Sequence, residues 1–300
     1  MSDQFASPVE PLIEGRPDAS DSRSSRPTFV SINPNDPPWG VSQALLIWLI
    51  SIAFLFIVPL LAIIPYVTYR ILVYGSVEGL GTNANLIFIS IVSVLPAHIF
   101  TFLIIWFLVT NRGRRPFLQT LGLTWPENSV QWLTVLLAIV LALFLLGLGV
   151  VITKLFGGSQ TQLDQIINSS LRARFATAFL AAVTGPFIEE VIYRGVLYPA
   201  LQRAIGMGWA VAVVSALFGG VHLLQYFNNL GVILVIVILS VSLTLVRART
   251  GSLLPSFVIH TVFNGIQAIL LVVQPFVEKT PPEKKAALGF LAHSLSRFLA

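Results

Sequence analysis

The chain has no cysteine and very little charge. Of its 300 residues, 10% are Asp, Glu, Lys or Arg, whereas 55% are hydrophobic, and the mean hydropathy is +0.84. Soluble domains carry about 25% charged residues, so this composition excludes an ordinary soluble protein. The lack of cysteine excludes thiol chemistry and disulfide bonds, and it leaves the redox compartment open.

Instead of charge, the chain has repeated apolar runs that are long enough to cross a bilayer, which takes about 20 residues. Hydropathy places seven spans at about residues 42–66, 86–109, 131–153, 175–202, 209–225, 231–246 and 253–273. The sequence therefore predicts an all-α polytopic transmembrane helical bundle of about seven to eight spans. Residues 41–274 would form its single membrane domain.

The two ends of the chain have a different composition from the spans. Residues 1–40 are rich in Ser, Pro and Asp, which predicts a disordered N-terminal tail. Residues 275–300 form a C-terminal tail in which apolar residues recur at helical spacing, at Leu288, Leu291, Leu295 and Phe298. This pattern favours an amphipathic helix on the membrane surface, with a short extra span as the alternative.

The basic residues gather at span ends. A pI near 9.8 would suit a nucleic-acid partner, but no basic patch supports one. Three arginines follow the second span (Arg112, Arg114, Arg115), and two follow the sixth (Arg247, Arg249). By the positive-inside rule, both loops and the amino terminus face the cytoplasm. We expect an integral membrane protein, of the plasma membrane if the source is bacterial, with lipid as a partner.

Two adjacent glutamates interrupt the fourth span. Between Asp164 and Glu278, the only acidic residues are Glu189 and Glu190. A carboxylate at bilayer depth is costly unless it is paired, protonated or facing water, so it indicates a functional site by default. The alternative is a structural ion pair between Glu190 and Arg194, which lie one helical turn apart. Because adjacent residues diverge by about 100° on a helix, we assign Glu190 to Arg194 and leave Glu189 as the free carboxylate.

Later spans supply further polar side chains. His222 lies at the end of the fifth span, while His260 and Asn264 share one face of the seventh. Each could simply hydrogen-bond a neighbouring helix. Taken together with the glutamates, they predict a shared polar cavity that holds water. His98 has no polar companion at helical spacing, and we interpret it as structural or interfacial.

A carboxylate and imidazoles around a water can perform general acid–base hydrolysis, and His260 with Asn264 could stabilise an oxyanion. Signatures of other hydrolases are absent. The chain has no Gly-x-Ser-Gly of the rhomboid type, no Gly-x-Gly-Asp of intramembrane aspartyl proteases and no His-Glu-x-x-His zinc motif. It also has no glycine-rich phosphate loop.

Three motifs in order resemble the CPBP family, which comprises type II CAAX prenyl endopeptidases and bacteriocin-processing or self-immunity (Abi) proteins. They are Glu189-Glu190-x-x-Tyr193-Arg194, Phe218-x-x-x-His222 and His260-x-x-x-Asn264, within residues 176–269 or about a third of the chain. The resemblance implies an intramembrane endopeptidase, in some members acting after a prenylated cysteine, whose partner is a membrane-bound peptide or protein.

The resemblance also implies roles for these residues. Glu189 would activate the attacking water with help from His222, His260 and Asn264 would form the oxyanion hole, and Glu190 with Arg194 would brace the site. The alternative is a non-catalytic immunity or binding protein, or a small-solute transporter, that keeps the polar cluster. Against transport, no inverted repeat is evident. The oligomeric state stays open.

Members of this family are often labelled metalloproteases, and zinc is the cofactor to consider. Glu189, His222 and His260 could hold zinc with a water in the fourth position. Zinc-bound histidines usually need an acceptor on the other ring nitrogen. With Glu190 assigned to Arg194, no such acid is available, so the sequence favours a metal-free mechanism.

Overall fold

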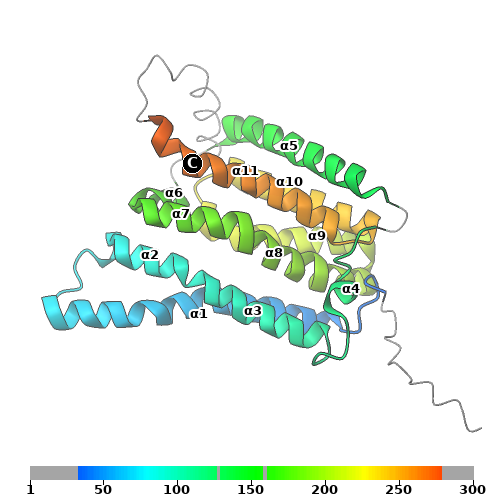
Figure 1. Cartoon of the computed structure of the whole chain (residues 1–300), viewed down its shortest axis with the longest axis horizontal. Helices are drawn as coiled ribbons and strands as arrows, with labels where there is room; N and C mark the ends of the chain where they lie inside the picture. Colours follow the sequence, from blue (N-terminus) through cyan, green and yellow to red (C-terminus); the bar gives the residue numbers. More distant parts are fainter. Residues whose placement is uncertain (1–32, 127–128, 158–160, 279–300) are drawn as a thin grey trace, which may run out of the picture. The chain divides into compact units, whose positions relative to one another are not determined.

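The computed structural model describes residues 33–126, 129–157 and 161–278, all within one compact unit that spans residues 31–300. These residues form helices and connecting turns, so the predicted all-α membrane fold is confirmed (Figure 1). The tail predicted over residues 1–32 and the amphipathic helix predicted over residues 279–300 lie outside the described residues.

The first half of the chain forms the helices α1 (Val41–Tyr74), η1 (Leu80–Thr82), α2 (Ala84–Val92), α3 (Val94–Val109), α4 (Phe117–Leu121) and α5 (Gln131–Phe156). The second half forms α6 (Gln162–Ser169), α7 (Leu171–Phe179), η2 (Leu180–Thr184), α8 (Gly185–Glu190), η3 (Val191–Leu197), α9 (Tyr198–Tyr226), α10 (Leu230–Thr250) and α11 (Leu254–Glu278). α1 packs along α3, and α10 packs between α9 and the α5–α11 pair (Figure 1).

Six of the described helices are long and apolar enough to cross a membrane, and the fourth runs for 56 residues, Leu171–Tyr226. At 1.5 Å per residue this is about 84 Å, far more than one crossing of about 30 Å. Gly206 breaks the helix with φ 79° and ψ 165°. The chain reverses there, because the ring of Phe218 returns to within 5.0 Å of the ring of Tyr193. The six candidate spans are thus roughly consistent with the seven predicted ones, because this long segment covers both the fourth and the fifth predicted spans.

One end of the bundle gathers the arginine-rich loops. Leu253 N–H donates to Gly122 O over 2.7 Å, which joins the turn after α10 to the loop that follows α3. Gly122 adopts φ +73°, and a Cβ there would lie 2.9 Å from Pro34 Cβ, so glycine is needed at this junction. The two loops that the positive-inside rule places on the same side therefore do share one end, which we call the basic end.

Residues 33–40, which the sequence assigns to the disordered tail, pack against the basic end; we call them the N-terminal strap. Trp39 is 1% exposed, and its Nε1–H donates to Val196 O over 3.0 Å. The Arg203 guanidinium donates to Trp39 O over 2.8 Å. A buried tryptophan can anchor such a polar segment, because it removes a large apolar area from water.

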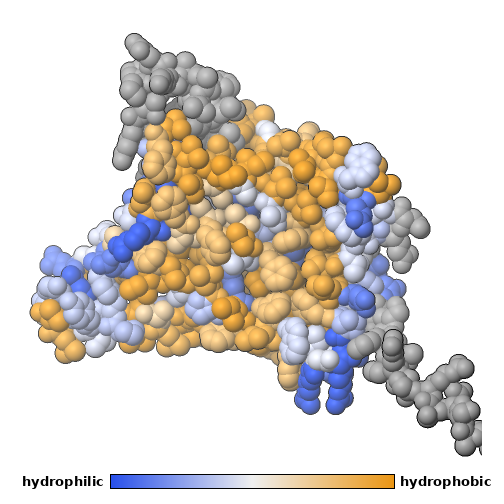
Figure 2. Space-filling view, viewed as in Figure 1, coloured by the Kyte–Doolittle hydropathy of each residue, from blue (hydrophilic) through white to orange (hydrophobic). Residues whose placement is uncertain are grey.

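The outer face of the helices is apolar (Figure 2). Large hydrophobic side chains remain exposed along α1 and α5, among them Phe56, Leu72, Leu137 and Phe144. By contrast, all seven residues of η3 are buried. The core is thus centred on the segment that follows the two glutamates, while the outer face suits contact with lipid.

Candidate active site

The two glutamates lie on a short α-helical segment, α8, between two π-helical turns. η2 ends at Thr184 and η3 begins at Val191, and π-turns are frequent at functional sites. At the junction, a Cβ on Gly185 would lie 2.9 Å from Leu180 O, so only glycine fits. Pro186 is then tolerated, because it stands in the first turn of α8. Gly185 thus allows the change from the π-helical turn to α8, four residues before Glu189.

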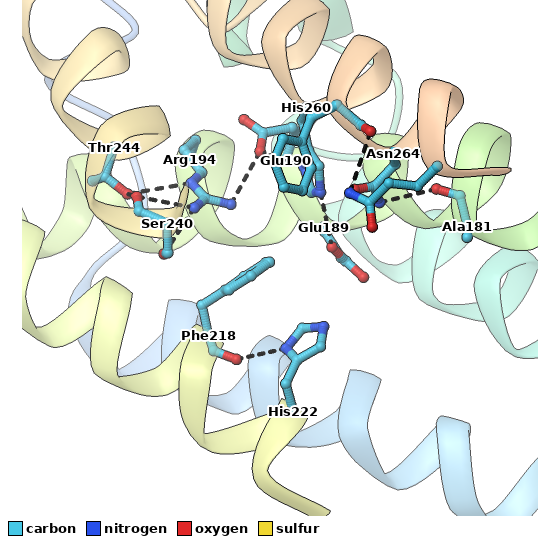
Figure 3. A network of polar contacts seen from close by, with 12 residues as sticks. Ala181, Glu189, Glu190, Arg194, Phe218, His222, Ser240, Thr244, His260 and Asn264 are labelled. Carbon is cyan, nitrogen blue, oxygen red and sulfur yellow. Dashed lines mark hydrogen bonds and ion pairs between the residues drawn. The ribbon is translucent and has the colours of Figure 1, made fainter. Parts of the chain in front are cut away.

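Glu190 and Arg194 form the buried half of the site. Arg194 Nη1 donates to Glu190 Oε1 over 3.0 Å, and these side chains are 0% and 1% exposed. Nη2 and Nε donate to α10, with Nη2 2.8 Å from Ser240 Oγ and Nε 3.3 Å from Thr244 Oγ1 (Figure 3). The pairing expected from the spacing is confirmed, and the extra hydrogen bonds are those that a buried ion pair requires.

His260 joins the two glutamates. Its Nδ1 lies 3.0 Å from Glu190 Oε1, and its Nε2 lies 3.5 Å from Glu189 Oε2. The assignment of Glu190 to Arg194 alone is therefore wrong, because one carboxylate oxygen serves both Arg194 and His260. His260 thus lies between the two carboxylates, with one ring nitrogen facing each.

Glu189 forms the open half of the site. Its side chain is 29% exposed, compared with 1% for Glu190. Across from it, His222 Nδ1 lies 2.8 Å from Phe218 O. Because a carbonyl only accepts, Nδ1 carries the hydrogen and Nε2 is left as the basic nitrogen. Figure 3 shows the His222 ring on the side of the glutamates, with no direct bond drawn to Glu189.

Asn264 lies one turn beyond His260 and contacts the π-helical turn η2. Its Nδ2 donates to Ala181 O over 3.0 Å (Figure 3). An amide nitrogen carries two hydrogens, so one remains for another acceptor. The structure thus brings Glu189, Glu190, Arg194 and His260 into direct contact, with His222 and Asn264 beside them.

Several contacts of the site were missed from the sequence. Ser240 and Thr244 stand four residues apart in an apolar span, a same-face polar pair that could have indicated a partner. Trp48 Nε1–H donates to Tyr193 Oη over 3.0 Å, and nothing in the sequence pointed to this. His98, expected to lack a polar companion, has its Nδ1 3.0 Å from Thr184 Oγ1.

The residues considered for zinc do not fit a metal centre. Over the described parts of the chain, no three His, Cys, Asp or Glu side chains are grouped so that they could hold a metal ion. Glu190 supplies His260 Nδ1 with an acceptor that was not predicted from the sequence, and Nε2 faces Glu189. His222 Nδ1, however, is directed to Phe218 O, and the three side chains are not grouped around one point. We therefore derive no step through zinc at Glu189, His222 and His260.

The chain was compared with known proteins. Residues 171–266 match the family model of the type II CAAX prenyl endopeptidase Rce1-like proteins. The match includes all three motifs, confirms the resemblance and supports membership of the chain in the CPBP family. Together with the six apolar helices, it supports an integral membrane protein with protease activity in general. No curated protein and no solved structure matches the chain.

Proposed function

We propose that the chain is an intramembrane endopeptidase in which Glu189 activates water for hydrolysis of a peptide bond. The observation that carries this proposal is the difference between the two glutamates. Glu190 is enclosed by Arg194 and His260, whereas Glu189 is 29% exposed and within 3.5 Å of an imidazole. A carboxylate that is both held in place and accessible to water is suited to general-base work.

In the proposed reaction, a water bound between Glu189 and His222 Nε2 gives a proton to Glu189 as its oxygen attacks the carbonyl carbon of the substrate. The free amide hydrogen of Asn264 and the Nε2–H of His260 stabilise the oxyanion that forms. The C–N bond then breaks, and the proton held by Glu189 passes to the leaving amine. His222 Nε2 is the second acceptor that orients the water.

The buried half of the site supports this chemistry indirectly. Glu190 fixes the orientation of the His260 ring through Nδ1, and Arg194 holds Glu190 in turn. The Arg194 guanidinium also lies over the Phe218 ring, 4.8 Å from its centroid. Phe218 O in turn accepts a hydrogen bond from His222 Nδ1. Arg194 therefore supports the orientation of His222 through Phe218 and that of His260 through Glu190.

For the substrate we propose a membrane-associated protein with a prenylated cysteine near its carboxyl terminus. The matching family model supports this class, and a prenyl chain would bring the peptide to the lipid-facing surface. By the positive-inside rule, the basic end faces the cytoplasm, where such substrates are made.

The test uses the purified protein in vesicles with an internally quenched peptide that carries farnesylated cysteine three residues before its carboxyl end. We expect cleavage after the farnesylated cysteine, identified by product mass, and none by Glu189→Gln. The same peptide without farnesyl is the control for the need for prenylation. If neither wild type nor Glu189→Gln cleaves the peptide while both bind it equally, the chain is a binding protein and the proposal is wrong.

A further inference from the structure

The proposed reaction gives no role to His98, although this side chain makes a polar contact next to the site. This half-buried histidine stands in α3, an otherwise apolar helix. Its Nδ1 lies 3.0 Å from Thr184 Oγ1. Thr184 is the last residue of η2 and directly precedes Gly185, where a Cβ would lie 2.9 Å from Leu180 O. A histidine outside the three motifs thus binds the segment that carries the glutamates.

Thr184, which His98 contacts, lies close in the chain to Glu189, whose two carboxylate oxygens have different neighbours. Glu189 Oε2 faces His260, whereas Oε1 lies over Gly185, 3.8 Å from the position of a Cβ there. Oε1 therefore lies beside Gly185, the residue that directly follows Thr184.

A second contact shows that α3 is docked on the site segment by one face. Phe102 lies one turn after His98, and its ring centroid is 5.9 Å from that of Phe187. Both rings are apolar, and Phe187 lies two residues before Glu189 in the sequence. The pair provides a matched control, because it joins α3 to α8, the helix that directly follows η2, without a hydrogen bond.

We propose that His98 is a positioning residue of the hydrolytic site, which holds Thr184 and thereby fixes the junction from which the Glu189 carboxylate projects. This inference rests on the proposed function. Displacing a catalytic group by about 1 Å can cost about 10²-fold in rate. Loss of the His98–Thr184 bond should therefore lower kcat by about 10- to 100-fold, with little change in KM.

The experiment measures kcat, KM and thermal unfolding with the farnesylated quenched peptide. His98→Ala and Thr184→Val should each lower kcat as stated, and the double variant should lose no more than either one. His98→Asn should recover most of the activity, because its amide reaches the position of Nδ1 and can bond Thr184. Phe102→Leu should leave kcat within about 3-fold of wild type, since the bond survives.

The proposal is overturned if His98→Ala keeps the wild-type kcat, or if the losses of kcat add up in the double variant. It is also overturned if the loss of kcat in each variant is proportional to the fall in its unfolding temperature. A second readout does not need turnover: the infrared carboxyl band of Glu189, assigned by its absence in Glu189→Gln. This band should shift in His98→Ala and return in His98→Asn. If wild type cleaves no peptide, the proposed function fails, and an unshifted band would still refute the role of His98.

Discussion

The two halves of the polar network differ in what surrounds the same type of side chain. Glu190 is 1% exposed and shares one oxygen between Arg194 and His260, whereas Glu189, its neighbour in the chain, is 29% exposed and has only the longer His260 contact. A turn of about 100° per residue is enough to separate them. The comparison teaches that environment assigns the roles: the enclosed carboxylate stabilises the structure, and the open one is available for chemistry.

The largest effect should come from changing the open carboxylate. Glu189→Gln keeps the shape of the side chain but cannot take a proton, so activity should fall by at least about 10²-fold. The unfolding temperature should stay near that of wild type, because the side chain is partly exposed. Rates with the farnesylated peptide and thermal unfolding in detergent measure both. Wild-type turnover by this variant would rule out the proposed mechanism.

Disrupting the buried pair of Glu190 and Arg194 should instead lower the stability of the folded protein. Arg194→Ala leaves Glu190 buried and without its cation, and we expect a loss of about 3–5 kcal/mol with low abundance in the membrane. Asp36→Asn is the matched control, because it removes an exposed ion pair with Arg203 and should cost no more than about 1 kcal/mol. Normal accumulation and melting of Arg194→Ala would show that the brace is not needed.

In the proposed reaction Asn264 donates to the oxyanion from the open half, so its loss should mainly affect the rate. Asn264→Ala should lower kcat by about 10²-fold, with a smaller change in KM. Gln267→Ala on the same helix is the control, since its amide only contacts Phe263 O. An equal loss of kcat in both variants would mean that the rate follows the packing of α11, and not the amide of Asn264.

A smaller effect is expected at the edge of the enclosed half. Trp48→Phe removes the hydrogen bond to Tyr193 Oη and should destabilise the protein by about 0.5–1.5 kcal/mol. The control is Trp132→Phe, which should change the unfolding temperature little because the Trp132 side chain is 69% exposed. If the two variants unfold at the same temperature, the contact from α1 does not contribute to the stability of the site.

The smallest effect should come from removing metal. We expect metal-depleted protein to cleave the farnesylated peptide at the wild-type rate in the presence of a strong chelator, because the proposed reaction uses side chains alone. Activity that disappears with the chelator and returns with stoichiometric zinc would overturn this prediction. Glu189→Gln with added zinc controls for metal-dependent contaminating proteases.

Much of the fold could be predicted from the sequence, because lipid imposes long apolar helices. The boundary between the fourth and fifth spans also fell close to Gly206, where the helix breaks. The N-terminal strap was not predicted, because its polar composition hides the anchoring role of one tryptophan, Trp39.

Within the site, contacts inside one helix could be predicted and contacts between helices could not. The Glu190–Arg194 pair follows from helical spacing. The bridge formed by His260 depends on how α11 packs against α8, which no spacing encodes. For the same reason the bond between His98 and Thr184 was missed, since these residues are 86 positions apart.

The ion pair between Glu190 and Arg194 has a consequence for the way the chain is made. Both residues belong to the segment Leu171–Tyr226, whereas Ser240, Thr244 and His260 are synthesised later. An unpaired charge costs about 2.5–3.5 kcal/mol at the centre of an inserting helix. Because the pair needs only its own helix, two of the three charges near α8 can neutralise each other before α10 and α11 leave the ribosome. Their spacing of one turn therefore favours insertion into the membrane as well as the stability of the folded site.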